Sequence, residues 1–143
     1  MPTITIRNAD RLQHAAVTRL QLYVAGQVHA LIYPFQSWLA KEVNSAADAD
    51  GIADASKLAG VLQAADPRWR AVMADYVAML TRARQQAGSI AFGPYRLRHN
   101  RYVTEPVERL QEAFVPTMDD WSKLAEMWLR RRNYALQVAQ QHV

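Results

Sequence analysis

Apolar residues in the first third of the chain recur at helical spacing. Between residues 17 and 38 they are three or four positions apart, which places them on one stripe of an α-helix. Asn8 or Asp10 can cap this helix, and Pro34, which has no N–H, predicts a kink or a break inside it. The stripe consists of Val17, Leu20, Val24, Val28, Leu31, Phe35 and Trp38.

A second helical stripe follows Asp66 and Pro67. A capping aspartate followed by proline at the first helical position predicts a helix start there, after a separate short helix over residues 57–65. We expect the second helix to end near Gln86, with Gly88 as its stop signal. Its apolar stripe consists of Trp69, Val72, Met73, Tyr76, Leu80 and Ala83.

A third helical pattern covers the last part of the chain, from Met118 to Val143. Thr117 and Asp120 form a variant of the capping box before it. No stop signal precedes Val143, which fits either a frayed terminal helix or the front piece of a longer chain. One face of this helix carries Trp121, Leu124, Ala125, Trp128, Ala135, Val138 and Ala139.

The remaining segments are short or irregular. Residues 44–56 are small, acidic and typical of a loop, residues 88–106 form an irregular tract, and residues 107–114 predict a short helix. Residues 3–7 alternate polar and apolar side chains, which predicts that residues 1–7 form an extended arm that must lie on a partner or remain mobile. The arm would make its contacts through Ile4, Ile6 and Arg7.

These patterns predict an all-α fold. We expect an antiparallel bundle of three main helices plus short helices, in which residues 8–143 form a single helical domain after the extended N-terminal arm. The tryptophans Trp38, Trp69, Trp121 and Trp128 should lie near the core or at an interface.

The composition restricts the kinds of cross-link and the cellular locations that we expect for this fold. Half of the 143 residues are hydrophobic, which is enough to fill one core without stabilising cross-links. The chain has no cysteine, so it has neither disulfides nor thiolate metal sites, and its N-terminus lacks the apolar core of a signal peptide. Its longest apolar zone, residues 22–35, is too short and too polar to span a bilayer. We expect a cytoplasmic or virion-associated protein that is neither secreted nor membrane-bound.

Positive charge is concentrated in the second half of the chain. The net charge is +4, and the Lys and Arg residues of 67–143 outnumber its acids while those of 1–66 do not. Residues 82–104 contain five arginines, interleaved with tyrosines, and no acid. This composition is typical of a nucleic-acid contact, but a loop docked on another subunit or a solvated loop explains it too. The candidate contacts are Arg82, Arg84, Tyr95, Arg96, Arg98, Arg101 and Tyr102.

A second arginine cluster, Arg130, Arg131 and Arg132, lies in the last helix. The helical angle places Arg130 outside and Arg132 along the apolar seam. An arginine on the seam must be paired, or must emerge where the core ends, near Leu129. A helix that projects beyond its core would favour a partner chain.

Signatures of catalysis are missing from the sequence. No glycines have nucleotide-loop spacing, no HExxH motif occurs, and no serine lies in a nucleophile elbow. His14 and His29 fall on the polar side of the first helix, and Asp48, Asp50 and Asp54 lack the ligand order of a calcium loop. We therefore expect no metal, no cofactor and no enzymatic activity. A third hypothesis is an enzyme or ligand binder whose site is assembled from residues scattered along the sequence.

The stretch MDDWSKLAEMWLRRRNYALQVAQQHV resembles helical regions of tailed-bacteriophage structural proteins. The closest likeness is to the helical front regions of minor head proteins near the portal, and it covers about residues 117–143. The resemblance implies a structural role in a virion and assigns no catalytic or binding residue.

Two functional hypotheses follow. The first is a non-enzymatic structural or assembly protein in an oligomeric particle such as a phage virion, with copies of itself or other structural proteins as partners. The alternative is a small basic helical protein that contacts nucleic-acid phosphates through its arginines.

Overall fold

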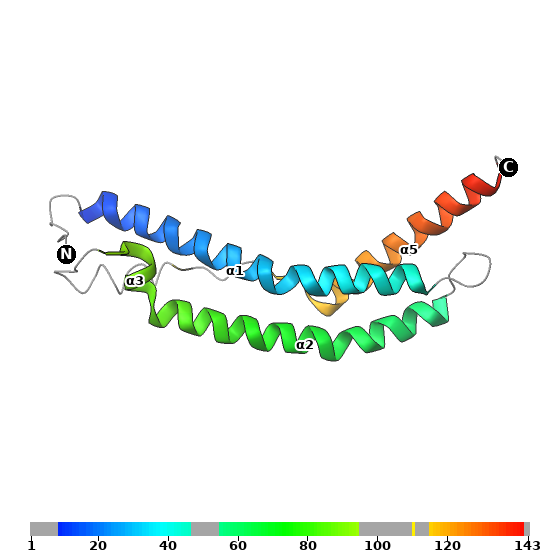
Figure 1. Ribbon diagram of the computed structural model, residues 1–143, viewed down its shortest axis with the longest axis horizontal. Coiled ribbons are helices and arrows are strands. Elements are labelled where there is room, and N and C mark those ends of the chain that lie inside the picture. The colour runs from blue at the N-terminus through cyan, green and yellow to red at the C-terminus, as the bar shows by residue number, and fades with distance from the viewer. Residues whose placement is uncertain (1–8, 47–54, 95–109, 111–114, 142–143) are drawn as a thin grey trace. The chain divides into compact units, whose positions relative to one another are not determined.

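The computed structural model describes residues 9–46, 55–94, 110 and 115–141, and these residues form helices and no strand. The prediction of an all-α fold is therefore confirmed. The predicted arm and most of the basic tract, including Ile4, Ile6, Arg7, Tyr95, Arg96, Arg98, Arg101 and Tyr102, lie outside the described residues. The helices, labelled in Figure 1, are α1 (Ala9–Ser45), α2 (Ala55–Gln85), α3 (Ala87–Phe92) and α5 (Met118–Gln141).

The chain divides into two compact units. The first unit consists of residues 1–30 and 75–114, and the second of residues 31–74 and 115–143. The long helices α1 and α2 each contribute to both units, whereas α3 belongs to the first and α5 to the second.

An aromatic cluster forms the core of the second unit, where α1, α2 and α5 pack together. The ring of Phe35 lies 5.0 Å from those of Trp69 and Trp121, and the two indoles are 5.4 Å apart in an edge-to-face arrangement. Trp38 and Trp128 are half-buried against the same cluster. Large aromatic rings in such geometry contribute packing energy beyond their buried area. All four tryptophans thus lie in or beside this core, as the sequence predicts.

The helix α2 is continuous through Pro67, so the prediction of a separate helix over residues 57–65 is wrong. The apolar stripe does not stop at the proline, because Leu58, Ala65 and Trp69 all belong to the same buried cluster. Their burial offsets the backbone hydrogen bond that Pro67 cannot donate. The carboxylate of Asp66 does not begin a helix but pairs with Arg70, with 3.0 Å between Oδ2 and Nε.

The helix α1 is longer than the sequence predicts. It runs unbroken through Pro34, so the prediction of a break there is wrong. The loop expected over residues 44–56 is shorter, because residues 44 and 45 still belong to α1 and residues 55 and 56 already belong to α2. The intervening residues 47–54, with Asp48, Asp50 and Asp54, lie outside the described residues.

The first unit has a core without tryptophan among its described residues. Among its described residues, the buried apolar ones are Ala16, Leu20, Val24, Val28, Tyr76, Met79, Leu80, Ala83, Ala87, Ala91, Phe92 and Leu110. These include Leu20, Val24 and Val28 of the predicted α1 stripe and Tyr76, Leu80 and Ala83 of the predicted α2 stripe, whereas Val17 is only half-buried. His14 and His29 are exposed, as expected for the polar side of α1.

The predicted end of the second helix near Gln86 is confirmed, because α2 ends at Gln85, but Gly88 is not its stop signal. It lies inside α3, and the terminating glycine is Gly93, whose φ of 60° suits a residue without a side chain. The N–H of Gly93 donates to the carbonyl of Ser89 at 2.9 Å. Burial of Ala87, Ala91 and Phe92 supplies the packing that extends helical structure past Gly88.

Candidate functional site

The start of α5 is fixed by reciprocal hydrogen bonds between Thr117 and Asp120. The backbone N–H of Thr117 and its hydroxyl donate to Oδ2 of Asp120, at 2.9 and 3.0 Å, and the N–H of Asp120 donates to Oγ1 of Thr117 at 3.2 Å. The predicted capping box is therefore confirmed. The hydrogen bonds from the Thr117 backbone and hydroxyl hold the pKa of Asp120 below its ordinary value.

The next turn of α5 carries an ion pair. Nζ of Lys123 lies 3.0 Å from Oδ2 of Asp119, one helical turn earlier. The hydrogen bond and charge of Asp119 raise the pKa of Lys123, and both side chains remain exposed. The pair and the capping box involve the two acids of the first turn of α5, Asp119 and Asp120, where the helix dipole favours negative charge.

Packing holds the first half of α5, residues 118–129. Trp121, Ala125 and Leu129 are buried at intervals of one helical turn. Trp121 is only 2% exposed, and within the described part of the chain its indole Nε1 has no hydrogen-bond acceptor. Its contribution is therefore apolar and aromatic contact rather than a hydrogen bond.

The second half of α5, residues 130–141, is here called the distal segment. It contains no buried residue, so the core ends at Leu129, as the sequence predicts for a projecting helix. Arg130 and Arg131 are exposed, and Tyr134 is 70% exposed. Arg132 is half-buried and has an interaction partner, as expected for an arginine on the apolar seam.

The arginine clusters predicted from sequence fall in different units. Arg82 and Arg84 lie on the last turn of α2, in the first unit, and both are exposed. Cations suit this position because the C-terminal end of a helix dipole is negative. Arg130, Arg131 and Arg132 lie together on α5, in the second unit. Of the first cluster the structure describes only Arg82 and Arg84, whereas all three arginines of the second cluster are described.

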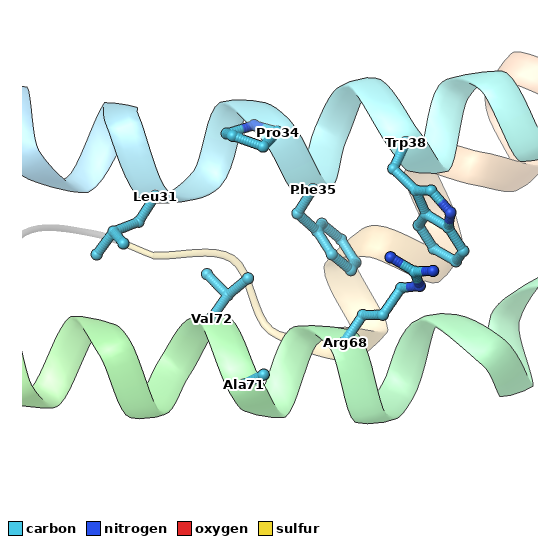
Figure 2. Close-up of a pocket in the computed structure, with 7 residues that line it drawn as sticks. All are labelled: Leu31, Pro34, Phe35, Trp38, Arg68, Ala71 and Val72. Carbon is cyan, nitrogen blue, oxygen red and sulfur yellow. The ribbon is translucent and has the colours of Figure 1, made fainter.

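A groove between α1 and α2 in the second unit was missed by sequence reasoning. It has a volume of about 280 Å³, and Figure 2 shows Trp38 on α1 and Arg68 on α2 pointing toward each other across it. The guanidinium carbon of Arg68 lies 4.3 Å from the centre of the Trp38 ring, a cation–π contact. The lining residues are Leu31, Pro34, Phe35, Trp38, Arg68, Ala71 and Val72.

Across the described ranges, no group of three or more histidine, aspartate or glutamate side chains gathers as metal ligands do. In the same ranges, no helix has both the length and the hydropathy that crossing a membrane requires.

Comparison with known proteins gives no relative for this chain. No protein-family description, curated protein or solved structure matches it.

Proposed function

We propose that this chain is a non-enzymatic structural or assembly protein that works within an oligomeric particle. The observation that carries the proposal is the distal segment of α5. It continues a helix whose first half is anchored in the core, yet none of its residues is buried within the chain. Arg130, Arg131 and the exposed ring of Tyr134 are residue types enriched in protein interfaces.

Charge supports a contact surface on the distal segment. Residues 127–141 contain three arginines and no acid, so this surface suits an acidic partner surface. The resemblance of residues 117–143 to structural proteins of tailed phages favours a virion as the particle. Within the second unit we further propose that α1 and α2 run antiparallel, because only residues 47–54 connect them.

Sedimentation velocity across a protein concentration series tests the assembly proposal. We expect concentration-dependent association that weakens about tenfold or more when Arg130→Gln and Arg131→Gln are combined, since interface arginines often act as hot spots. The matched control combines Arg70→Gln and Lys123→Gln. It removes the same charge from two exposed residues of the same unit, each paired with an acid on its own helix. A monomer at every concentration would contradict self-assembly.

Nucleic-acid binding is the second candidate, and the acid-free distal segment favours it too. Binding of a labelled random-sequence DNA duplex, followed by anisotropy across a salt series, separates it from protein assembly. If Arg130 and Arg131 each contact a phosphate, replacing both with glutamine lowers the log–log salt slope by about 2. No binding at low salt would remove this candidate and leave the assembly proposal standing.

A further inference from the structure

The groove between α1 and α2 has an apolar floor and a cationic edge. Phe35 is buried at its base, Leu31 and Val72 are half-buried along its sides, and Figure 2 shows these side chains directed into the space between the helices. Among the described residues, Arg68 is the only charged one in the lining. An apolar pocket with one convergent polar group is the usual design of a small-ligand site.

Arg68 contacts an aromatic ring, and no described carboxylate pairs with it. Its guanidinium stacks on Trp38, which occupies one face of the planar group, while the N–H donors lie in the plane and point outward. Among the residues that the structure describes, no carboxylate pairs with Arg68. Two positions later, Arg70 does have such a partner, because it pairs with Asp66 on its own helix. Arg68 is exposed to solvent and contacts Trp38, so its guanidinium donors are accessible to a ligand beside an apolar surface.

We propose that this groove binds a small apolar monocarboxylate. The carboxylate would accept two hydrogen bonds from the edge of the Arg68 guanidinium, and the apolar body would cover Phe35, Leu31 and Val72. A volume of about 280 Å³ exceeds the roughly 150 Å³ cavity that holds one benzene ring in a protein. The ligand class is therefore a single ring or branched chain that carries one carboxylate. The site uses none of the residues of the distal segment, so it does not depend on the proposed function.

Titration of the full chain with phenylacetate tests this proposal. The indole N–H signal of Trp38 is followed by NMR, and the Trp38→Phe variant identifies it. We expect saturable shifts at millimolar ligand that are confined to the groove. The neutral isostere phenylacetamide and the ringless anion acetate should each bind about tenfold more weakly. Phenylacetamide lacks the carboxylate that Arg68 would bind, and acetate lacks the ring that would cover the apolar floor. Equal binding of phenylacetate and phenylacetamide would overturn the role of Arg68.

Two variants distinguish binding in the groove from a general effect of positive charge on α2. Arg68→Gln should weaken phenylacetate binding about tenfold, since it removes a charge-assisted hydrogen bond. Arg70→Gln is the matched control, because it removes the same charge from the same helix but lies outside the groove lining. Equal weakening by both variants, or no response of Trp38 at millimolar ligand, would reject the site. The comparison of the three probes on the unaltered chain decides the question even if a variant folds poorly.

Discussion

In the first half of α5 every fourth residue, from Trp121 through Ala125 to Leu129, is buried, whereas in the distal segment none is. The two halves belong to one continuous helix and carry the same kind of apolar stripe, which continues through Ala135, Leu136 and Ala139. The difference is therefore not in the helical pattern but in what covers it.

This contrast shows that an amphipathic pattern predicts a helix without saying which surface covers its apolar face. The first half has its covering surface in the same chain, in the aromatic cluster around Phe35 and Trp69. The distal segment relies more on local propensity, which its alanine, leucine, glutamine and arginine residues supply. A helix whose stability comes mainly from propensity gains most from a partner. The distal segment is therefore the part of α5 that a partner chain would stabilise most, as the assembly proposal requires.

The largest expected effect is at Trp121. Trp121→Ala should reduce the free energy of unfolding of the second unit by roughly 3–5 kcal/mol, because it leaves a cavity in the aromatic cluster. Tryptophan fluorescence during urea unfolding measures this, since all four tryptophans lie in the second unit and three remain in the variant.

Two controls sharpen this prediction. Tyr134→Ala, in the distal segment, should change the unfolding free energy by less than about 0.5 kcal/mol, as exposed positions do. Trp121→Phe should cost less than Trp121→Ala, because the lost indole N–H makes no hydrogen bond among the described residues. A large loss in Tyr134→Ala would break the distinction between the two halves.

The boundary between the halves is tested at Leu129, which is 7% exposed. Leu129→Ala should cost about 2–3 kcal/mol, near the low end for a buried leucine at the margin of a core. The matched variant Leu136→Ala, two turns later, should cost about 1 kcal/mol or less because that side chain is only half-buried. Equal losses at both positions, measured by the same urea titration, would place the end of the core beyond Leu129.

Sequence patterns predicted the parts of the fold that depend on periodicity. The stripes of α1 and α2 and the face of α5 up to Leu129 are buried or half-buried largely as spacing predicts, and the Thr117–Asp120 capping box formed as expected. Local signals failed where tertiary packing opposed them. Pro67 is a start signal and Gly88 a stop signal in isolation, but α2 runs through Pro67 and Gly88 lies inside α3, in each case beside buried residues.

The candidate site was predictable only where it lies on one helix. The exposure of Arg130 follows from its helical angle within α5. The pairing of Arg68 with Trp38 joins residues thirty positions apart on different helices, and no local spacing reports it. Arg68 is adjacent in sequence to the buried Trp69, and the apolar stripe of α2 identifies the face of Trp69 but not the neighbouring edge.

A smaller effect is expected at the N-terminal cap of α5. Thr117→Ala removes the hydroxyl that accepts from the Asp120 N–H and should cost about 1 kcal/mol of stability in the second unit. Thr117→Ser keeps the hydroxyl and serves as the matched control, with little expected change. Both are measured by urea unfolding followed by tryptophan fluorescence. A loss in Thr117→Ser as large as in Thr117→Ala would mean that the methyl group, not the hydrogen bond, is responsible.

The smallest effect concerns the acid dependence of the same cap. The pKa of Asp120 is lowered in the folded chain by its hydrogen bonds to Thr117, so the ionised carboxylate stabilises the folded state. This contribution is fully present above the ordinary aspartate pKa of about 3.9 and is lost as pH falls through the lower folded value. Asp120→Asn should therefore flatten the fall in stability of the second unit in that acid range. Asp119→Asn also removes an acid from the first turn, but Asp119 pairs with Lys123 rather than with the cap. If the two variants show the same pH profile, the acid sensitivity comes from the total charge of the first turn, and the hydrogen-bonded cap is not its source.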